Sequence, residues 1–152
     1  MKQEQLQVFI QGVIEYFNKI AGSQIDVGVP YLKEQGKKVI LGYTGVIGIS
    51  GRMQGGIYIT ADRNFLMDLL NKIMPGANSD ENKLTDMIGE LANTIAGNAQ
   101  KTLGKEFNIS IPMVLTQSSK DQVHSFEIKA PTFVIPFKWS ENQAYLVVGL
   151  VD

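Results

Sequence analysis

The sequence predicts an α+β fold in which a largely antiparallel sheet carries long helices on one face. Two stretches with apolar side chains at helical spacing, one at the start of the chain and one near its middle, are each followed by short strand-like runs between turn residues. Helices and strands therefore come in blocks, unlike the regular alternation of a doubly wound parallel sheet. Because no long linker interrupts the chain, residues 1–152 are expected to form a single domain.

Helix boundaries follow from caps and stops. Gly22 is a plausible stop for the first helix, and Pro75 for the second. Asp62 is a candidate N-cap for the second helix, and Ser79 or Asp80 for the third. These signals predict helices over residues 4–21, 63–74 and 80–103.

Apolar runs bounded by turn residues predict the strands, which are expected at 24–33, 38–50, 55–61, 109–118, 123–130, 132–139 and 143–151. The run GVIGISG…GIYIT in the first half loosely resembles FVIPFKWS…AYLVV in the second. Since each of these runs follows a long helix, the sequence favours an internal α-β duplication.

Composition excludes several classes of function. Acidic and basic residues nearly cancel, leaving a formal net charge of −1, so neither a nucleic acid nor an anionic membrane is an expected partner. No signal peptide and no membrane-spanning apolar stretch is recognisable, and cysteine is absent, which together favour a cytoplasmic protein. The only histidine, His124, is too isolated for a metal cluster and is expected to be structural or solvent-facing.

Two short segments are nearly repeated. ELANTIAG, residues 90–97, and EYFNKIAG, residues 15–22, share Glu, Asn, Ile, Ala and Gly at the same places. Residues three apart on a helix lie on the same side, so Glu90 projects with Asn93, and Glu15 with Asn18. The apolar stripes of both helices place these pairs on the opposite, exposed face. In the third helix the same face carries Asp86, Glu90, Asn93 and Gly97.

On an arbitrary helix, exposed Glu and Asn would be ordinary solvated residues. Three features favour a surface for a partner instead. Gly89 and Gly97 each cost about 1 kcal/mol relative to Ala inside a helix, and glycine on an exposed face would allow another backbone to approach. Asn93 is a poor helix former in mid-helix. The small residues at Ala92, Ala96 and Ala99 predict a slim helix that could enter another protein's cleft.

The chemistry of such a pair is limited but specific. A carboxamide does not titrate near neutral pH, yet it can hold a water molecule in one orientation. A carboxylate one turn away can pair with a partner's Lys or Arg. Positioning a water for in-line attack is what hydrolysis of a reactive acyl phosphate requires.

The stretch from Asp86 to Gly97, DMIGELANTIAG, resembles the signature of the CheC/CheX/FliY family of chemotaxis phosphatases, and the whole helix is most similar to CheX members. TGVIGISGRMQGGIYIT resembles the central hairpin of CheX-type proteins, and Pro112 resembles the proline after the catalytic helix, at a slightly shorter spacing. The resemblance implies long helices on an antiparallel sheet. It also implies a phosphatase that acts on the phosphoaspartate of a CheY-like response regulator.

By motif position, the resemblance implies that Glu90 binds the regulator's active-site lysine and that Asn93 orients the attacking water, with Asp86 and Gly97 in support. It implies no cofactor or metal of the protein's own, magnesium in the regulator, and a homodimer in the cytoplasm. An exposed strand edge within 38–61 or 132–151 is the expected dimer surface.

The first helix departs from the CheX pattern, because Glu15 and Asn18 form a second pair, as in CheC. Tyr16 and Phe17 stand where the third helix has Leu91 and Ala92, so this copy is bulkier, and Gln11 replaces the Asp. The copy is either a second working site or a remnant of duplication. A different class also stays open: a non-catalytic interaction module like the middle domain of the flagellar switch protein FliM. A metal or small-molecule enzyme is disfavoured, since no ligands cluster in the sequence.

Overall fold

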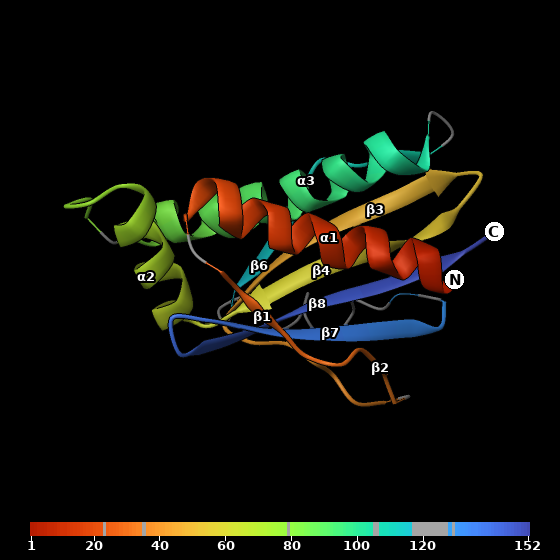
Figure 1. Ribbon diagram of the computed structural model, residues 1–152, viewed down its shortest axis with the longest axis horizontal. Helices are drawn as coiled ribbons and strands as arrows, with labels where there is room; N and C mark the ends of the chain where they lie inside the picture. The colour runs from red at the N-terminus through yellow and green to blue at the C-terminus, as the bar shows by residue number, and fades with distance from the viewer. Residues whose placement is uncertain (23, 35, 79, 105–106, 117–127, 129) are drawn as a thin grey trace.

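Helices cover one face of an eight-stranded sheet in the computed structural model, which describes residues 1–22, 24–34, 36–78, 80–104, 107–116, 128 and 130–152. Helices α1 and α3 lie side by side over the sheet, and α2 lies at one end of the molecule (Figure 1). The elements are α1 (Gln3–Ile20), β1 (Asp26–Val27), β2 (Tyr31–Leu32), β3 (Tyr43–Gly51), β4 (Gln54–Ala61), α2 (Arg63–Ile73), α3 (Glu81–Leu103), β5 (Phe107–Ile109), β6 (Met113–Thr116), β7 (Thr132–Trp139) and β8 (Asn142–Val151).

The sheet has the order β1-β7-β8-β4-β3-β5, with β2 also pairing with β7 and β6 with β3, and every pair is antiparallel. Its centre is the β4–β8 pair, flanked by the hairpin partners β3 and β7. The predicted α+β class is therefore confirmed. Two units of one long helix and one hairpin, α1 with β3–β4 and α3 with β7–β8, meet at that central pair, which is the arrangement expected of an α-β duplication.

Caps define the helices as predicted. The Asp62 carboxylate accepts a hydrogen bond from the Phe65 amide at 2.9 Å, and Asp80 accepts one from Lys83 at 2.9 Å. Helix α1 ends at Ile20, and Gly22 follows at a φ of 61°, the left-handed conformation that terminates helices.

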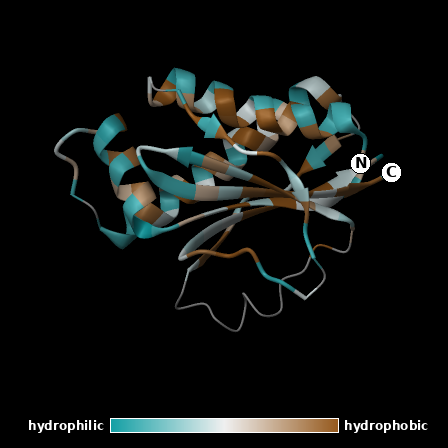
Figure 2. Ribbon diagram, turned by 60° about the horizontal axis from the view of Figure 1, so that its bottom comes forward, coloured by the Kyte–Doolittle hydropathy of each residue, from teal (hydrophilic) through white to brown (hydrophobic). Residues whose placement is uncertain are grey.

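The main core fills the space between the helices and the sheet. In the ribbon of Figure 2 hydrophobic (brown) and hydrophilic (teal) residues alternate along the helices, as expected for helices with one buried face. Four aromatic rings, those of Phe17, Phe65, Phe137 and Trp139, pack together with centroids about 6 Å apart and join α1, α2 and β7. Helix α3 lies close to β3, because a Cβ added at Gly45 would come within 2.6 Å of the Ile88 carbonyl oxygen.

A smaller apolar cluster lies apart from the main core, built from Val46, Tyr58, Leu115, Val134 and Val147. Val39 and Ile40 pack against it, and the Leu41 amide donates to the Thr60 hydroxyl at 2.7 Å. For this reason residues 38–42 do not extend the strand as predicted for 38–50, and β3 begins at Tyr43.

Prolines shorten two predicted strands. The run 24–33 contains only β1 and β2, which lie on either side of Pro30. In the described part of the run 109–118, β5 ends at Ile109 and β6 begins at Met113, directly after Pro112. Proline has no N–H to donate to a ladder, so pairing stops at these positions. Of the predicted strand 123–130 the structure describes only Ile128 and Ala130, and neither is in a strand; His124 lies outside the described residues.

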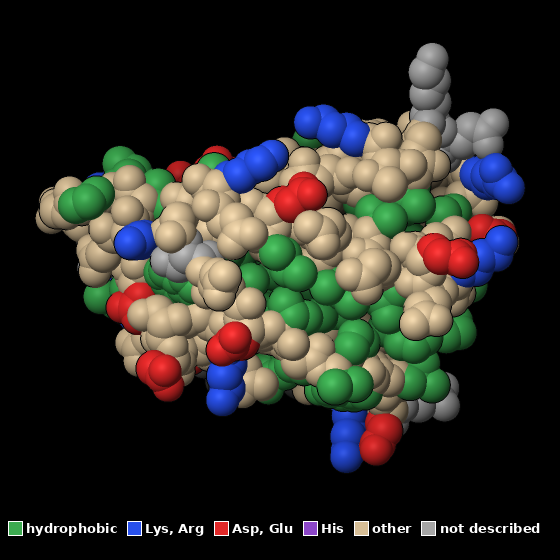
Figure 3. Space-filling view, viewed as in Figure 1, with side chains coloured by type: hydrophobic (Ala, Val, Ile, Leu, Met, Phe, Trp, Pro, Cys, Tyr) green, Lys and Arg blue, Asp and Glu red, His purple; other side chains and the backbone are tan. Residues whose placement is uncertain are grey.

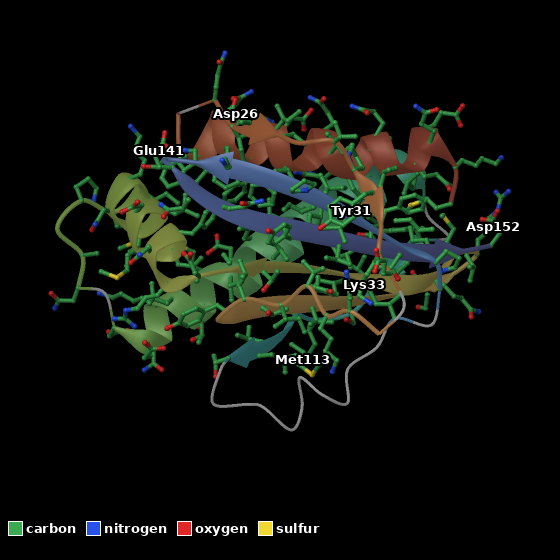
Figure 4. The ribbon with its side chains drawn as sticks, turned by 90° about the horizontal axis from the view of Figure 1, so that it is seen from below. Asp26, Tyr31, Lys33, Met113, Glu141 and Asp152 are labelled. Carbon is green, nitrogen blue, oxygen red and sulfur yellow. The ribbon has the colours of Figure 1, made fainter. Side chains whose placement is uncertain are left out.

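The predicted dimer edge is wrong. Strand β3 is covered by β5 and β6, and β7 is covered by β1 and β2, so neither 38–61 nor 132–151 presents a bare edge. Asp26 and Tyr31, labelled in Figure 4, lie in β1 and β2, the two short strands that pair alongside β7.

Candidate functional site on the helix layer

The outer face of α3 carries the predicted residues together. Asp86, Glu90 and Asn93 are exposed and Gly97 is half-buried. The opposite face is buried, including Leu84, Ile88, Leu91 and Ile95. At about 100° per residue, the four outer positions form a narrow stripe along more than three turns of helix. The stripe predicted from the apolar periodicity is therefore confirmed as a surface feature.

Glu90 and Asn93 are left without partners. Neither side chain makes a hydrogen bond or an ion pair with any residue that the structure describes. Glu81, at the start of the same helix, behaves differently: it accepts hydrogen bonds from the Tyr43 hydroxyl at 2.6 and 2.8 Å and pairs with Arg63. The Tyr43 hydrogen bond, with help from Arg63, holds the pKa of Glu81 below its ordinary value. Of the two glutamates of α3, Glu81 is therefore committed to the fold and Glu90 is open to an external group.

The small residues of α3 serve packing inside the chain. Ala92, Ala96 and Ala99 are all fully buried, and Gly89 faces Val114 and Pro112, where an added Cβ would lie 3.2 Å from Val114 Cγ2. The expectation that these residues make a slim helix for another protein's cleft is therefore wrong. They let α3 lie close to its own sheet and to the β5–β6 connection.

Gly97 is different from Gly89. A Cβ added at Gly97 would meet no described atom within 4 Å, and its φ is not positive. Neither packing nor backbone conformation explains a glycine in the middle of this helix, where Ala would be more stable. A surface that must be approached closely from outside would explain it.

Helix α1 packs antiparallel beside α3 (Figure 1). The two helices are in contact at Gly12, where an added Cβ would lie 3.7 Å from both the carbonyl oxygen and Cγ2 of Ile95. In a pair of antiparallel helices, the residue four positions after Gly12 lies opposite the residue four positions before Ile95. Tyr16 therefore lies across from Leu91, the residue at the same position of the repeated segment in α3. The two helices are thus related by an approximate local twofold axis that passes near these residues.

The pair on α1 is placed differently from the pair on α3. Asn18 is exposed as expected, whereas Glu15 is half-buried, which corrects the expectation that both lie fully on the outer face. Helix α1 also ends two residues after Asn18, at Ile20, whereas α3 continues ten residues past Asn93 to Leu103. The Glu-Asn pair of α1 thus lies near a helix end, whereas the pair of α3 lies in mid-helix.

Sequence reasoning missed Tyr16, which it treated only as a bulky replacement. Tyr16 is 7% exposed, and burial, with the negative charge of Glu90 as second cause, raises the pKa of its phenol to about 12. The signal that could have found it is its position in the repeat, since it faces the helix that carries the other pair.

A hollow of about 540 Å³ lies elsewhere, lined by Gly42, Tyr43, Asp62, Arg63, Asn64, Glu81 and Thr116. Arg63 and Glu81 are paired with each other there, and Asp62 caps α2. Glu81 lies on the side of α3 opposite to Glu90, because nine residues at about 100° each bring it half a turn around the helix. No three acidic, His or Cys side chains in the described ranges are grouped to hold a metal ion.

None of the described helices has the length and apolarity needed to cross a membrane. Figure 3 shows acidic and basic side chains interspersed over the helix layer.

The fold and the exposed Glu-x-x-Asn stripe define a class of protein, and comparison identifies it. Residues 43–138 match the family model described as chemotaxis phosphatase CheX. The chain therefore belongs to the CheX family. No match was found among curated protein sequences.

Solved structures share the fold over essentially the whole chain. A CheC-like superfamily protein from Shewanella sp. PV-4 has a TM-score of 0.85 at 24% identity, with 100% of each chain covered. A chain of the CheX–CheY–BeF3–Mg2+ complex from Borrelia burgdorferi has a TM-score of 0.77 at 19% identity, covering 99% of this chain and 100% of that one. The FliM middle domain from Vibrio alginolyticus has a TM-score of 0.62 at 8% identity, with 95% and 93% covered.

Proposed function

We propose that this protein is a phosphatase for the phosphoaspartate of a CheY-like response regulator, and that Glu90 and Asn93 perform the reaction. The observation that carries the proposal is the open pair itself. In a member of the CheX family, a carboxylate and a carboxamide stand together, exposed and without partners, in the middle of the longest helix. Such polar groups are available to a docked protein without first breaking contacts inside their own fold.

The proposed chemistry needs no protein base. The Asn93 carboxamide accepts and donates hydrogen bonds, so it can hold a water in line with the aspartyl-phosphate bond of the regulator. The water oxygen attacks phosphorus, the bond to the aspartate oxygen breaks, and the products are inorganic phosphate and the regulator's free carboxylate. Glu90 pairs with a lysine of the regulator and fixes the orientation of docking.

Asp86 and Gly97 support this pair at either end of the stripe. Gly97 leaves space for the regulator's backbone, and Asp86 extends the acidic side of the surface one turn before Glu90. Magnesium, which neutralises charge on the phosphoryl oxygens, is expected in the regulator's own site and not on this chain. The Borrelia complex, which pairs a CheX with CheY, BeF3 and Mg2+, supports this division of roles.

A second candidate function is a non-catalytic interaction module, and one observation favours it. The chain shares its fold with the FliM middle domain. The fold therefore does not distinguish an enzyme from a binding module, and the distinction depends on the chemistry of Glu90 and Asn93. Binding of a receiver domain without faster dephosphorylation would support the module.

The remaining parts of the proposal follow from the family resemblance. Residues 1–152 would act as one phosphatase domain, in the cytoplasm, as a homodimer. Since β3 and β7 are both covered by short strands, the dimer surface is not assigned to either of them. Analytical ultracentrifugation of the full chain would test the dimer.

The direct test is release of phosphate from a phosphorylated CheY-like receiver domain. Asn93→Ala should lower kcat by about 10²–10³-fold, the usual effect of removing a positioned catalytic polar group. Its affinity for a receiver loaded with BeF3 and Mg2+ should stay near that of the wild type. Asn71→Ala is the control, because Asn71 is also an exposed helical asparagine, in the last turn of α2 and away from the α3 stripe. Unchanged kcat in Asn93→Ala would contradict the mechanism.

A further inference from the structure

The edge of the sheet beside α3 contains a β-bulge at Ile111 and Pro112. The antiparallel pairing with β3 is regular up to Ser110 and resumes at Met113. Between these points the edge has two residues where β3 has only Ile47. Bulges of this kind occur at sheet edges and next to active sites, where they redirect a side chain.

Ile111 is held between two anchored neighbours. The Ser110 amide donates to the Gly48 carbonyl oxygen, and the Gly48 amide donates to the Ser110 hydroxyl, both at 2.9 Å. On the other side Pro112 lies against α3, with its Cβ 3.9 Å from the place that a Cβ of Gly89 would take. A residue that precedes proline is also restricted in its own backbone. The position of Ile111 is therefore set by the fold.

The bulge lies on the Asn93 side of the outer stripe of α3. The Gln100 side chain donates to the Phe107 carbonyl oxygen at 2.8 Å, which fixes the start of β5 against α3. Pro112, after β5, faces Gly89 of the same helix. Gln100 and Gly89 have nearly the same direction around α3, because eleven residues at about 100° each make about three full turns. Asn93 lies between them along the axis, one turn after Gly89, so the chain from β5 to Pro112 passes beside Asn93.

Ile111 has the largest exposed fraction, 88%, of the large apolar side chains in the part of the chain that the structure describes. A single exposed apolar residue is ordinary on its own, but this one is fixed by the fold next to the proposed site. The stripe supplies a carboxylate and a carboxamide and no apolar group. Protein interfaces are usually centred on a few buried anchors with polar groups around them. Ile111 would supply such an anchor.

We propose that Ile111 is a docking residue for the phosphorylated receiver domain, and that its side chain packs on an apolar surface of the receiver next to the phosphoaspartate. This inference rests on the proposed function of Glu90 and Asn93. The occupant is the receiver because the bulge is continuous with the stripe, so that a protein that reaches Asn93 from outside also meets Ile111. Since the fold already orders Ile111, and isoleucine has little rotamer freedom, the contact costs little entropy.

The first experiment tests the contact without relying on catalysis. In methyl NMR of the full chain, Ile111→Val identifies the signal of Ile111. A receiver domain loaded with BeF3 and Mg2+ should shift this signal and transfer saturation to it. The Met113 methyl is the internal control, because Met113 pairs with Val46 of the smaller cluster and therefore lies on the sheet face away from the helices. A bound receiver that transfers no saturation to Ile111 would overturn the inference.

The second experiment tests the contribution to docking. Ile111→Ser removes exposed apolar surface and opens no cavity, so the melting temperature should not change. The KM for the phosphorylated receiver, and the Kd for the loaded receiver, should rise about tenfold, the scale of burying one isoleucine side chain, with kcat unchanged. Ile111→Val should keep most of the affinity. Met113→Ser is the matched control, since Met113 is also an exposed apolar residue, at 47%, and it should leave both constants unchanged.

The outcomes separate the possible failures. If Asn93→Ala abolishes phosphate release and Ile111→Ser leaves KM and Kd unchanged, Ile111 is not a docking residue and the proposed function stands. If Ile111→Ser changes the sedimentation of the protein and not its affinity for the receiver, a second copy of the chain covers the bulge and the inference is wrong. If the wild type neither binds the loaded receiver nor accelerates phosphate release, the proposed function and this inference are both wrong.

Discussion

The copies ELANTIAG on α3 and EYFNKIAG on α1 share five residues, yet the fold uses them differently. In α3 the Glu and Asn are both exposed, in mid-helix, with an open surface at Gly97. In α1 the Glu is half-buried, and the final Gly has a φ of 61° just past the helix end. A shared motif therefore does not imply a shared role, because the position of the motif along its helix decides what its residues can reach.

The largest difference in docking affinity between the copies is expected at the glutamates. Glu90→Gln should weaken docking of the phosphorylated receiver by roughly ten- to a hundredfold, since a hydrogen bond to a charged group contributes about 1.5–3 kcal/mol. The same substitution in α1, Glu15→Gln, should change the affinity less than twofold. Titration of each variant with a receiver loaded with BeF3 and Mg2+ measures both effects. Equal losses from the two variants would show that both copies dock a regulator.

A smaller effect is expected at the glycine of the α1 copy. Gly22 adopts a left-handed conformation that costs an L-residue about 1–2 kcal/mol, so Gly22→Ala should lower the free energy of unfolding by about that amount. Phosphatase activity at saturating regulator should stay unchanged. Denaturant unfolding and the phosphate-release assay measure the two quantities, and a large loss of activity at full folding would assign function to this end of α1.

The smallest effect on stability, with the opposite sign, is expected at the glycine of the α3 copy. Gly97→Ala should raise the free energy of unfolding by about 0.5–1 kcal/mol, because the new methyl group meets open space. The same variant should lose affinity for the regulator if close approach is required there. Gly89→Ala is the control inside the chain, since its Cβ would press on Val114. A Gly97→Ala protein that is both more stable and fully active would remove Gly97 from the site.

Periodicity and caps were enough to predict the helices and the exposed stripe on α3. Helix α3 begins after Asp80 and α2 after Asp62, as the N-cap signals indicated, and the hairpins β3–β4 and β7–β8 match their apolar runs closely. These features depend on local sequence, which is why they could be recognised without the fold.

Features that depend on long-range packing could not be predicted. The burial of Gly89 depends on Val114 of β6, which is not local in sequence. The placement of Tyr16 across from Leu91 depends on the antiparallel packing of α1 on α3, which local sequence does not specify. For this reason the small residues of α3 were predicted to contact a partner protein, whereas they pack in the chain's own core.

The central claim is that the chemistry belongs to the α3 copy alone. The most direct test measures kcat for phosphate release at saturating phosphorylated receiver in three proteins: the wild type, Asn18→Ala and Asn93→Ala. The account predicts that Asn18→Ala equals the wild type and that Asn93→Ala falls to the receiver's own rate of phosphate loss. A loss of about half the activity in each variant, or loss in Asn18→Ala alone, would contradict it.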